Sequence, residues 1–285
     1  YNAGHFLGFM SMFNNDILRS VSLYKGDFPA QYGGRMSSVL ETPTKDGDLH
    51  SFRGNASLGI VSSKIMVEGP IVRDRLSFCA SARGSFFDVL FPMIRKIPPR
   101  SALHFYDANA KLTWVASDRD RLSLSAFMGG DKFGSSLEQY GMNVMDFRFR
   151  SQVASLRWSH AFSPRLHSNV TLYHSKSIFD LDCDYNFAIF DYQSFIRESG
   201  IRTGLTWLSS DRNTLEAGVQ LPLIRVNSGD CIPKGDNIAI TEMHIAPNFA
   251  IQPSIYVQDK YIRAAKGGTG YAKVGGNYGG GMRAS

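Results

Sequence analysis

The sequence has no run of eighteen apolar residues, which is the length that a membrane-spanning helix needs. We therefore expect no membrane-spanning helix. A membrane protein built from strands is not excluded, because such strands alternate apolar and polar side chains and escape a search for long apolar runs. The mean hydropathy of −0.17 is compatible with that alternation.

Cysteine is scarce, with three residues in a chain of 285, so at most one disulfide could form. Cys183 and Cys231 fall in expected loop regions and could pair, whereas Cys79 lies in an expected strand. We favour the alternative in which the cysteines have no structural role.

Concentrated charge and catalytic motifs are also missing. The net charge is +6, but the lysines and arginines are scattered instead of forming one patch, so no nucleic acid partner is expected. There is no Gly-x-Ser-x-Gly elbow, phosphate-binding loop or supported carboxylate pair. The sequence predicts no catalytic residue, no enzyme activity and no cofactor.

A metal site is not predicted either. Asp180, Asp182 and Asp184 alternate in an expected loop and resemble a row of Ca²⁺ ligands. The glycine and the later glutamate of a calcium-binding loop are absent, so we favour a solvated loop.

What the sequence does contain is a short polar turn that returns about every 45 residues, near 72–75, 117–121, 163–165 and 209–213. Apolar residues alternate next to each turn, as in Leu122, Leu124, Ala126 and Met128. Between the turns lie longer segments that read as irregular, at 86–101, 131–146 and 180–197. Short turns at one rim and long loops at the other are typical of an outer-membrane β-barrel.

We expect about nine or ten strands, near residues 52–62, 64–71, 76–86, 104–117, 121–132, 147–160, 167–180, 198–209, 214–226 and 251–259. In the segment 104–117, Tyr106, Leu112 and Trp114 alternate with Asp107 and Lys111, which predicts one lipid-facing and one inward-facing set. A β-propeller is the main soluble alternative, but its blade needs four short strands per period and this sequence offers two long ones.

Tryptophan marks the same rim as the short turns. Trp114, Trp158 and Trp207 each lie two to five residues before a turn, which is the position of an interfacial aromatic girdle. The alternative is that they are ordinary core residues.

The first 50 residues differ in sequence pattern from the rest of the chain, and they predict a small α+β unit. A capped turn or helix is expected at 13–18, and strands at 21–24 and 39–42. Between them stands Phe-Pro-Ala-x-Tyr-Gly-Gly-Arg at 28–35, where two glycines allow a sharp bend or a close approach.

These motifs carry a resemblance to a family. The segment 13–35, with the following Ser-Ser-Val-Leu and Thr-Lys-Asp-Gly, resembles the end of the plug domain of TonB-dependent outer-membrane receptors of the Bacteroidetes type. Residues 54–85, 215–218 and 253–259 resemble barrel strands of that family. The resemblance covers about residues 1–260. It implies a C-terminal part of the plug at 1–50 and an N-terminal part of a transmembrane antiparallel β-barrel at 51–260. The family's barrel has 22 strands, so we expect a fragment with an incomplete, mainly β barrel.

The resemblance also implies a function. A TonB-dependent receptor is an energy-coupled importer in the cell outer membrane, with outer-membrane lipid, a small nutrient ligand and the inner-membrane TonB complex as partners. Whether a surface lipoprotein accompanies this chain is open. The plug turn Tyr32, Gly33, Gly34 and Arg35 is expected to pack against the barrel wall.

Residues 261–285 resemble something else. Their glycine content supplies little apolar surface for a lipid-facing strand. The order of residues over 257–285 resembles the cofactor-lysine segment of branched-chain amino-acid aminotransferases, and Lys273 matches the lysine that binds pyridoxal phosphate there. Without the rest of that site we expect this lysine to be non-functional. A chimeric reading frame is our hypothesis, and a flexible glycine-rich tail is the alternative. For the whole chain, the alternatives to the importer are an aminotransferase fragment and a soluble β-rich binding protein.

Overall fold

The computed structural model describes residues 4–5, 10–25, 29–32, 38–59, 61–85, 87, 101–137, 142–185, 188–234, 240–265, 268–279 and 282–284. Most of them belong to one 14-stranded sheet. Among the described residues, no helix is long and apolar enough to cross a membrane.

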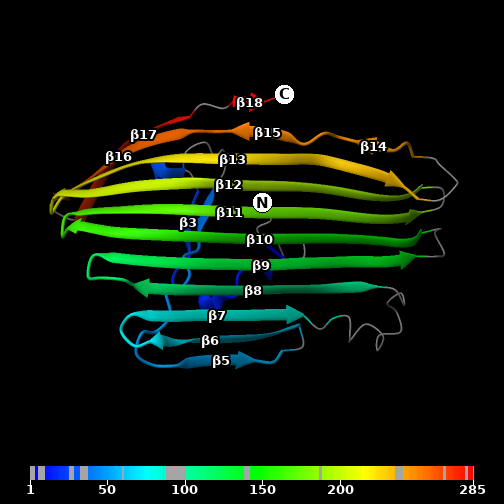
Figure 1. Cartoon of the computed structure of the whole chain (residues 1–285), viewed down its shortest axis with the longest axis horizontal. Helices are drawn as coiled ribbons and strands as arrows, with labels where there is room; N and C mark the ends of the chain where they lie inside the picture. Colours follow the sequence, from blue (N-terminus) through cyan, green and yellow to red (C-terminus); the bar gives the residue numbers. More distant parts are fainter. Residues whose placement is uncertain are drawn as a thin grey trace.

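The sheet is antiparallel, and its strands follow one another in chain order (Figure 1). The main path consists of β5 (Arg53–Ser57), β6 (Ser62–Val72), β7 (Leu76–Ser85), β8 (Ala102–Val115), β9 (Asp120–Leu137), β10 (Met142–Ser163), β11 (Leu166–Tyr185), β12 (Ala188–Ser210), β13 (Asn213–Pro233), β16 (Ser254–Ala265) and β17 (Gly268–Gly279). Three short strands extend it beside β13, namely β14 (Met243–His244), β15 (Asn248–Ile251) and β18 (Met282–Ala284). Nearest neighbours in sequence are thus nearest neighbours in space, as in an up-and-down barrel wall.

The predicted short turns are present. Residues 73–75, 116–119, 164–165 and 211–212 connect β6 to β7, β8 to β9, β10 to β11 and β12 to β13. In the first turn Asp74 has a positive φ of 63°, which aspartate tolerates better than most residues. The mainly β, partial-barrel fold is confirmed.

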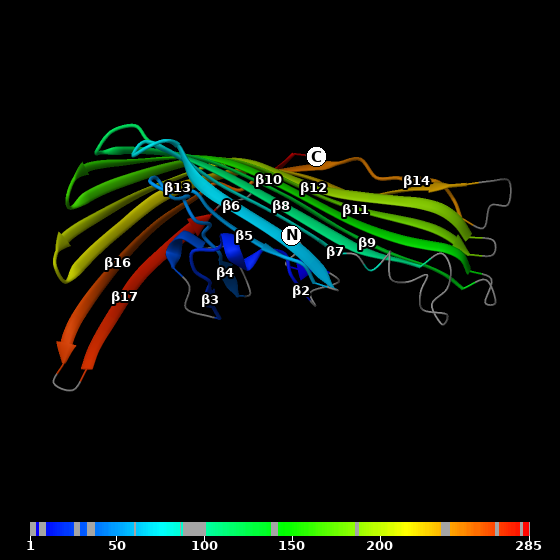
Figure 2. The ribbon, with the colours of Figure 1, turned by 90° about the horizontal axis from the view of Figure 1, so that it is seen from below.

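The first described residues form a separate layer on one face of the sheet. They comprise β1 (Gly4–His5), β2 (Met10–Ser11), the 3-10 helix η2 (Asn15–Ile17), β3 (Ser22–Tyr24), the 3-10 helix η3 (Ala30–Tyr32) and β4 (Val39–Glu41). The Asn14 side chain caps η2 by accepting a hydrogen bond from the Asp16 amide at 3.1 Å, as the capped turn predicted. Figure 2 shows β2, β3 and β4 in the hollow of the curved sheet. We call the described residues among 4–48 the plug segment, a name taken from the resemblance above, and the sheet face that they cover the inner face.

The two faces of the wall differ as the alternation predicted. On β8, Asp107 is 1% exposed and Thr113 is buried beneath the plug segment, while Trp114 on the opposite, outer face is 49% exposed. Leu112, Leu124, Leu156 and Leu172 form a ladder of direct register partners along the outer face of β8 to β11. The outer face therefore presents a broad apolar surface, which a soluble protein rarely exposes.

The strands at the long-loop end are longer than expected. We predicted irregular segments over 131–146 and 180–197, but β9 reaches Leu137, β10 begins at Met142, and β11 and β12 include most of 180–197. The prediction was wrong there because it rested on the glycines and aromatic residues of these segments, and aromatic residues suit strands equally well. Cross-strand ion pairs such as that of Arg150 with Asp180, at 2.6 Å, stabilise these segments as strands.

The final segment also differs from expectation. The strands β16 and β17 pair in register from Ser254 with Gly279 to Ala265 with Gly268. The expected tail thus takes part in the sheet as an edge hairpin. This pairing does not test the resemblance of the segment to aminotransferases, which stays a prediction.

The three cysteines are all free. Cys183 lies on β11 and Cys231 on β13, so β12 separates them, and the disulfide that the sequence left open does not form.

Two glycines on the inner face accommodate a tyrosine that lies flat on the wall. Gly204 and Gly218 are register partners, and Gly218 also pairs with Tyr256, which is buried. A Cβ atom on Gly218 would lie 2.2 Å from the Thr203 carbonyl oxygen and 2.5 Å from the Tyr256 hydroxyl. The space above this glycine is already filled by the tyrosine ring.

We therefore expect Gly218→Val to lower the free energy of unfolding by about 1–3 kcal/mol, because overpacking forces backbone and ring apart. Urea unfolding of the purified protein in detergent micelles measures the change. The matched control is Ala217→Val, on the outer face of the same strand, for which we expect no loss. Equal midpoints for the two variants would contradict the close approach.

Candidate functional site

The plug segment is fixed to the wall by buried charges. His5 is fully buried, and its Nδ1 lies 2.9 Å from a carboxylate oxygen of Asp131 on β9. Its Nε2 lies 3.5 Å from Asp107 on β8. Asp107 also accepts a hydrogen bond from the Arg83 Nε at 2.6 Å, and the His5 ring stacks on Phe105 at 4.5 Å. We call these five residues the His5 anchor.

Burial by itself lowers the pKa of His5, but the carboxylates of Asp107 and Asp131 outweigh burial, so the pKa is raised above its ordinary value of 6.5. The anchor therefore favours the imidazolium. Arg83 reaches further into the plug segment and donates a hydrogen bond to the Ser11 carbonyl oxygen at 2.6 Å. One cluster thus joins three wall strands to both β1 and β2.

A raised pKa in the folded state means that the His5 contribution to stability is fully present below the unfolded pKa and is lost as pH rises through the folded pKa. We expect β1 and β2 to detach from the wall more easily at about pH 9 than at about pH 5, where imidazole is protonated. Hydrogen exchange of the Ser11 and Met10 amides measures this detachment. In His5→Phe the pH dependence of this detachment should vanish. If that variant kept the same pH dependence, the assignment to His5 would be contradicted.

A second contact joins the plug segment to the wall around Asp46. Its carboxylate lies 2.7 Å from the Lys111 Nζ of β8 and also pairs with Arg19 of the plug segment. Burial raises the pKa of Asp46, but the hydrogen bond from Lys111 and the nearby arginines outweigh it and leave that pKa lowered. Ser77 of β7 donates a hydrogen bond to the Asp46 carbonyl oxygen at 2.8 Å. Two residues further on, Asp48 has a pKa of about 2 because the amides of His50 and Ser51 hydrogen-bond to its carboxylate.

The third contact lies at η3, next to the predicted plug turn. The Ala30 amide donates to the Gln258 Oε1 of β16 at 2.8 Å, and Gln220 of β13 donates to the Gln31 carbonyl oxygen. Tyr32 ends this helix, and burial together with the Glu41 carboxylate raises the pKa of its phenol. Gly33, Gly34 and Arg35 lie outside the described residues, so the packing of the complete turn against the wall stays a prediction.

An aromatic surface occupies the inner face at the long-loop end. The ring centroids of Phe149 and Phe179 are 4.8 Å apart, those of Phe147 and Phe179 are 6.3 Å apart, and Phe133 and Tyr192 extend the row on either side. We call these five rings the aromatic cluster. Register places Phe149 directly opposite Asp131, which belongs to the His5 anchor. The cluster and the anchor are therefore neighbours.

The outer face at the same end is charged. Four cations pair there with carboxylates on adjacent strands: Arg150 with Asp180, Arg148 with Asp182, Lys132 with Asp146, and Lys234 with Asp191. Asp180 and Asp182, considered above as calcium ligands, are thus neutralised by arginines. Among the described residues, no group of three or more His, Cys, Asp or Glu side chains is placed to hold a metal ion.

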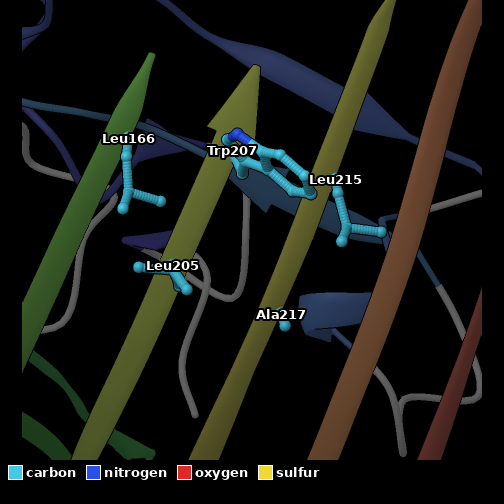
Figure 3. A pocket seen from close by; sticks show the side chains of 5 residues that line it. All are labelled: Leu166, Leu205, Trp207, Leu215 and Ala217. Atoms are coloured by element: carbon cyan, nitrogen blue, oxygen red, sulfur yellow. The ribbon is translucent and has the colours of Figure 1, made fainter. Parts of the chain in front are cut away.

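The outer face near the short turns is apolar. A depression of about 280 Å³ lies there, and its walls are Leu166, Leu205, Trp207, Leu215 and Ala217, from β11, β12 and β13. Figure 3 shows these five side chains. Of these five side chains, four are hydrocarbon and only the Trp207 indole can form a hydrogen bond. The depression therefore fits an acyl chain better than a polar substrate. Trp114, Trp158 and Trp207 are all exposed, which contradicts their reading as core residues and fits the girdle.

The structure places Lys273 in β17, where it is the register partner of Lys260 in the edge hairpin. Its side chain lies outside the described part of the chain. A role with pyridoxal phosphate stays a prediction from the resemblance alone. The residues that sequence reasoning missed are those of the His5 anchor, since His5 and Asp131 are 126 residues apart and no local pattern joins them.

Comparisons with known proteins agree with this geometry. No protein-family model and no curated protein matches the sequence. Among solved structures, Pseudomonas aeruginosa FpvA in an iron complex with a heterologous pyoverdine matches with a TM-score of 0.66 and 12% identity, over 94% of this chain and 43% of that one. The copper transporter OprC matches with a TM-score of 0.61 and 15% identity, over 90% of this chain and 41% of that one.

These matches define the class of fold. The chain has the fold of part of a TonB-dependent outer-membrane receptor, with an open portion of the barrel wall. It spans less than half the length of either solved structure. At these identities the likeness concerns the fold.

Proposed function

We propose that the chain is part of a TonB-dependent importer in the outer membrane, which takes up a small nutrient ligand. The observation that carries this proposal is the plug segment, held on the inner face of a wall whose outer face is apolar. Three sets of polar contacts hold it, at His5, Asp46 and η3. A segment that obstructs a barrel must be displaced for transport, so its attachment has to be firm and reversible.

In this proposal the aromatic cluster contacts the ligand. Flat rings at the long-loop end offer a large rigid surface at small entropic cost. FpvA is named for an iron–pyoverdine complex and OprC for copper transport, which supports a small, metal-bearing ligand as the first class to test. Because Phe149 lies opposite Asp131, a ligand on the cluster binds beside the His5 anchor.

The energy source in this proposal is the TonB complex of the inner membrane, which pulls on the plug. A surface lipoprotein is a further candidate partner. Transport by this route requires binding and conformational change without covalent chemistry.

The test is uptake by cells that make the protein, compared with cells in which its gene is deleted. Radiolabelled iron, as a pyoverdine complex, and copper are the two probes, each with and without a protonophore. We expect the protein in the outer-membrane fraction and energy-dependent uptake of one probe. Phe149→Ala combined with Phe179→Ala should reduce that uptake about tenfold or more, because each ring contributes of the order of 1 kcal/mol of stacking.

The matched control is Phe162→Ala, which removes an exposed ring from the outer face. It should leave uptake unchanged. Recovery of the protein from a soluble or inner-membrane fraction would contradict the proposal, as would uptake that survives the protonophore.

A further inference from the structure

Three cations stand side by side on the outer face. Lys176 of β11, Arg197 of β12 and Arg225 of β13 are direct register partners across three adjacent strands. Side chains in this relation have Cβ atoms about 4.5–5.5 Å apart, and like charges so placed repel each other. We call these residues the cation row. Such a row is unfavourable unless an anion lies against it.

The part of the chain that the structure describes supplies no such anion. Among the described residues, none of the three cations has a carboxylate within ion-pairing distance. The guanidinium groups of Arg197 and Arg225 donate no hydrogen bond to any described residue. Within the part of the chain that the structure describes, the Nε atoms of Arg197 and Arg225 are enclosed and have no hydrogen-bond partner. By contrast, the arginines of β10 a few residues nearer the long-loop end are each paired with an aspartate. The cation row is therefore distinct from the ion-paired surface next to it.

The surroundings of the row are apolar and aromatic. The Arg197 guanidinium lies 4.6 Å from the Phe195 ring centroid, and that of Arg225 lies 5.2 Å from Phe249. Phe249 continues the row on β15 and is 51% exposed. On the side toward the short turns, Leu223 and Ile251 are register partners and both are exposed. The row thus borders the apolar outer surface.

The position of the cation row along the membrane normal fits a membrane interface. Arg197 and Trp207 lie on the outer face of β12, ten residues apart. At about 3.4 Å per residue and a tilt of about 45°, they are separated by about 24 Å along the membrane normal. The apolar band of such barrels is about 25 Å tall. If Trp207 marks one interface, the cation row lies at the other.

We propose that the cation row binds the phosphorylated headgroup of a membrane lipid whose acyl chains lie on Leu172, Leu223 and Ile251. Arginine and lysine are the side chains that suit phosphate oxygens, and a phosphate would offset the repulsion among the three neighbouring cations. A free anion would leave the neighbouring apolar surface uncovered, which favours a lipid as its source. The inference rests on the proposed function for the placement of the outer face in a membrane.

The experiment is native mass spectrometry of the detergent-purified protein with dioleoylphosphatidic acid as the probe. Dioleoylphosphatidylcholine and inorganic phosphate are the comparison ligands. The variant replaces all three cations with glutamine: Lys176→Gln, Arg197→Gln and Arg225→Gln. The matched control removes three cations from the short-turn rim, with Arg119→Gln, Arg165→Gln and Arg212→Gln.

We expect the cation-row variant to bind phosphatidic acid about tenfold or more weakly, since each cation near an anionic surface contributes several-fold in affinity. The rim variant should bind like the unchanged protein. A charge-conserving variant with Lys176→Arg, Arg197→Lys and Arg225→Lys should keep binding, which separates loss of the site from loss of the fold.

Equal phosphatidic acid binding by the cation-row variant and the rim variant would overturn the proposal. Displacement of the lipid by inorganic phosphate at the same concentration would overturn it in favour of a free-anion site. Failure to bind phosphatidic acid by a protein that is found in the outer membrane would overturn this inference alone. A protein absent from that membrane would overturn the proposed function.

Discussion

Asp107→Ala should release the plug segment from the wall, at a cost of about 3–5 kcal/mol in the free energy that holds it there. The reason is that Asp107 is buried between two cations, His5 and Arg83, and its removal leaves Arg83 without its wall carboxylate. A buried charge without a partner costs far more than a surface pair contributes. The measurement is the urea concentration at which trypsin begins to cleave after Arg19.

The matched control for this prediction is Asp211→Ala. Asp211 lies in a short turn, its side chain is 96% exposed, and it is 3.7 Å from Arg165. We expect the control to leave the urea dependence of cleavage unchanged. If trypsin cleavage after Arg19 depended on urea in the same way in Asp107→Ala and Asp211→Ala, the His5 anchor would not be what holds the plug segment.

The second large effect is expected for Leu156→Arg, at about 2–4 kcal/mol of lost stability, because arginine is most costly at the bilayer midplane. Leu156 is in the middle of the outer face, with Leu124 and Leu172 as its register partners. Unfolding of the protein in lipid vesicles by urea measures the loss.

Phe162→Arg is its matched control. Phe162 lies on the same strand and the same face, but next to the short turn, where the cost of arginine falls to about 0–1 kcal/mol. A similar cost at both positions would mean that the outer face does not cross a bilayer.

The features that the sequence predicted are those encoded locally. A strand with period two shows its faces within ten residues, as β8 does with Asp107 and Trp114 on opposite sides. The short turns are equally local, since polar residues such as Ser117 and Asp120 hydrogen-bond within the turn itself.

The features that the sequence did not predict depend on distant residues. The strands extend over 131–137 and 188–197 because aromatic and ionic partners on neighbouring strands outweigh the loop preference of aspartate and glycine, as Arg150 does for Asp180. The cation row is likewise invisible along the chain, because Lys176, Arg197 and Arg225 become neighbours only through strand register. For the candidate site the sequence predicted only the plug turn, of which Tyr32 is described, and the packing of that turn on the wall stays a prediction.

The most direct test of a membrane-spanning wall with a plug on its inner face is the alternation of solvent and lipid access along β8. Spin labels are placed one at a time from Tyr106 to Trp114 in protein reconstituted in vesicles, with Cys79, Cys183 and Cys231 replaced by serine. We predict high collision rates with oxygen dissolved in the bilayer at Tyr106, Ala108, Ala110, Leu112 and Trp114, and low rates at the residues between them, which the plug segment covers. Uniform rates along the strand, or high rates at Asp107 and Asn109 instead, would contradict it.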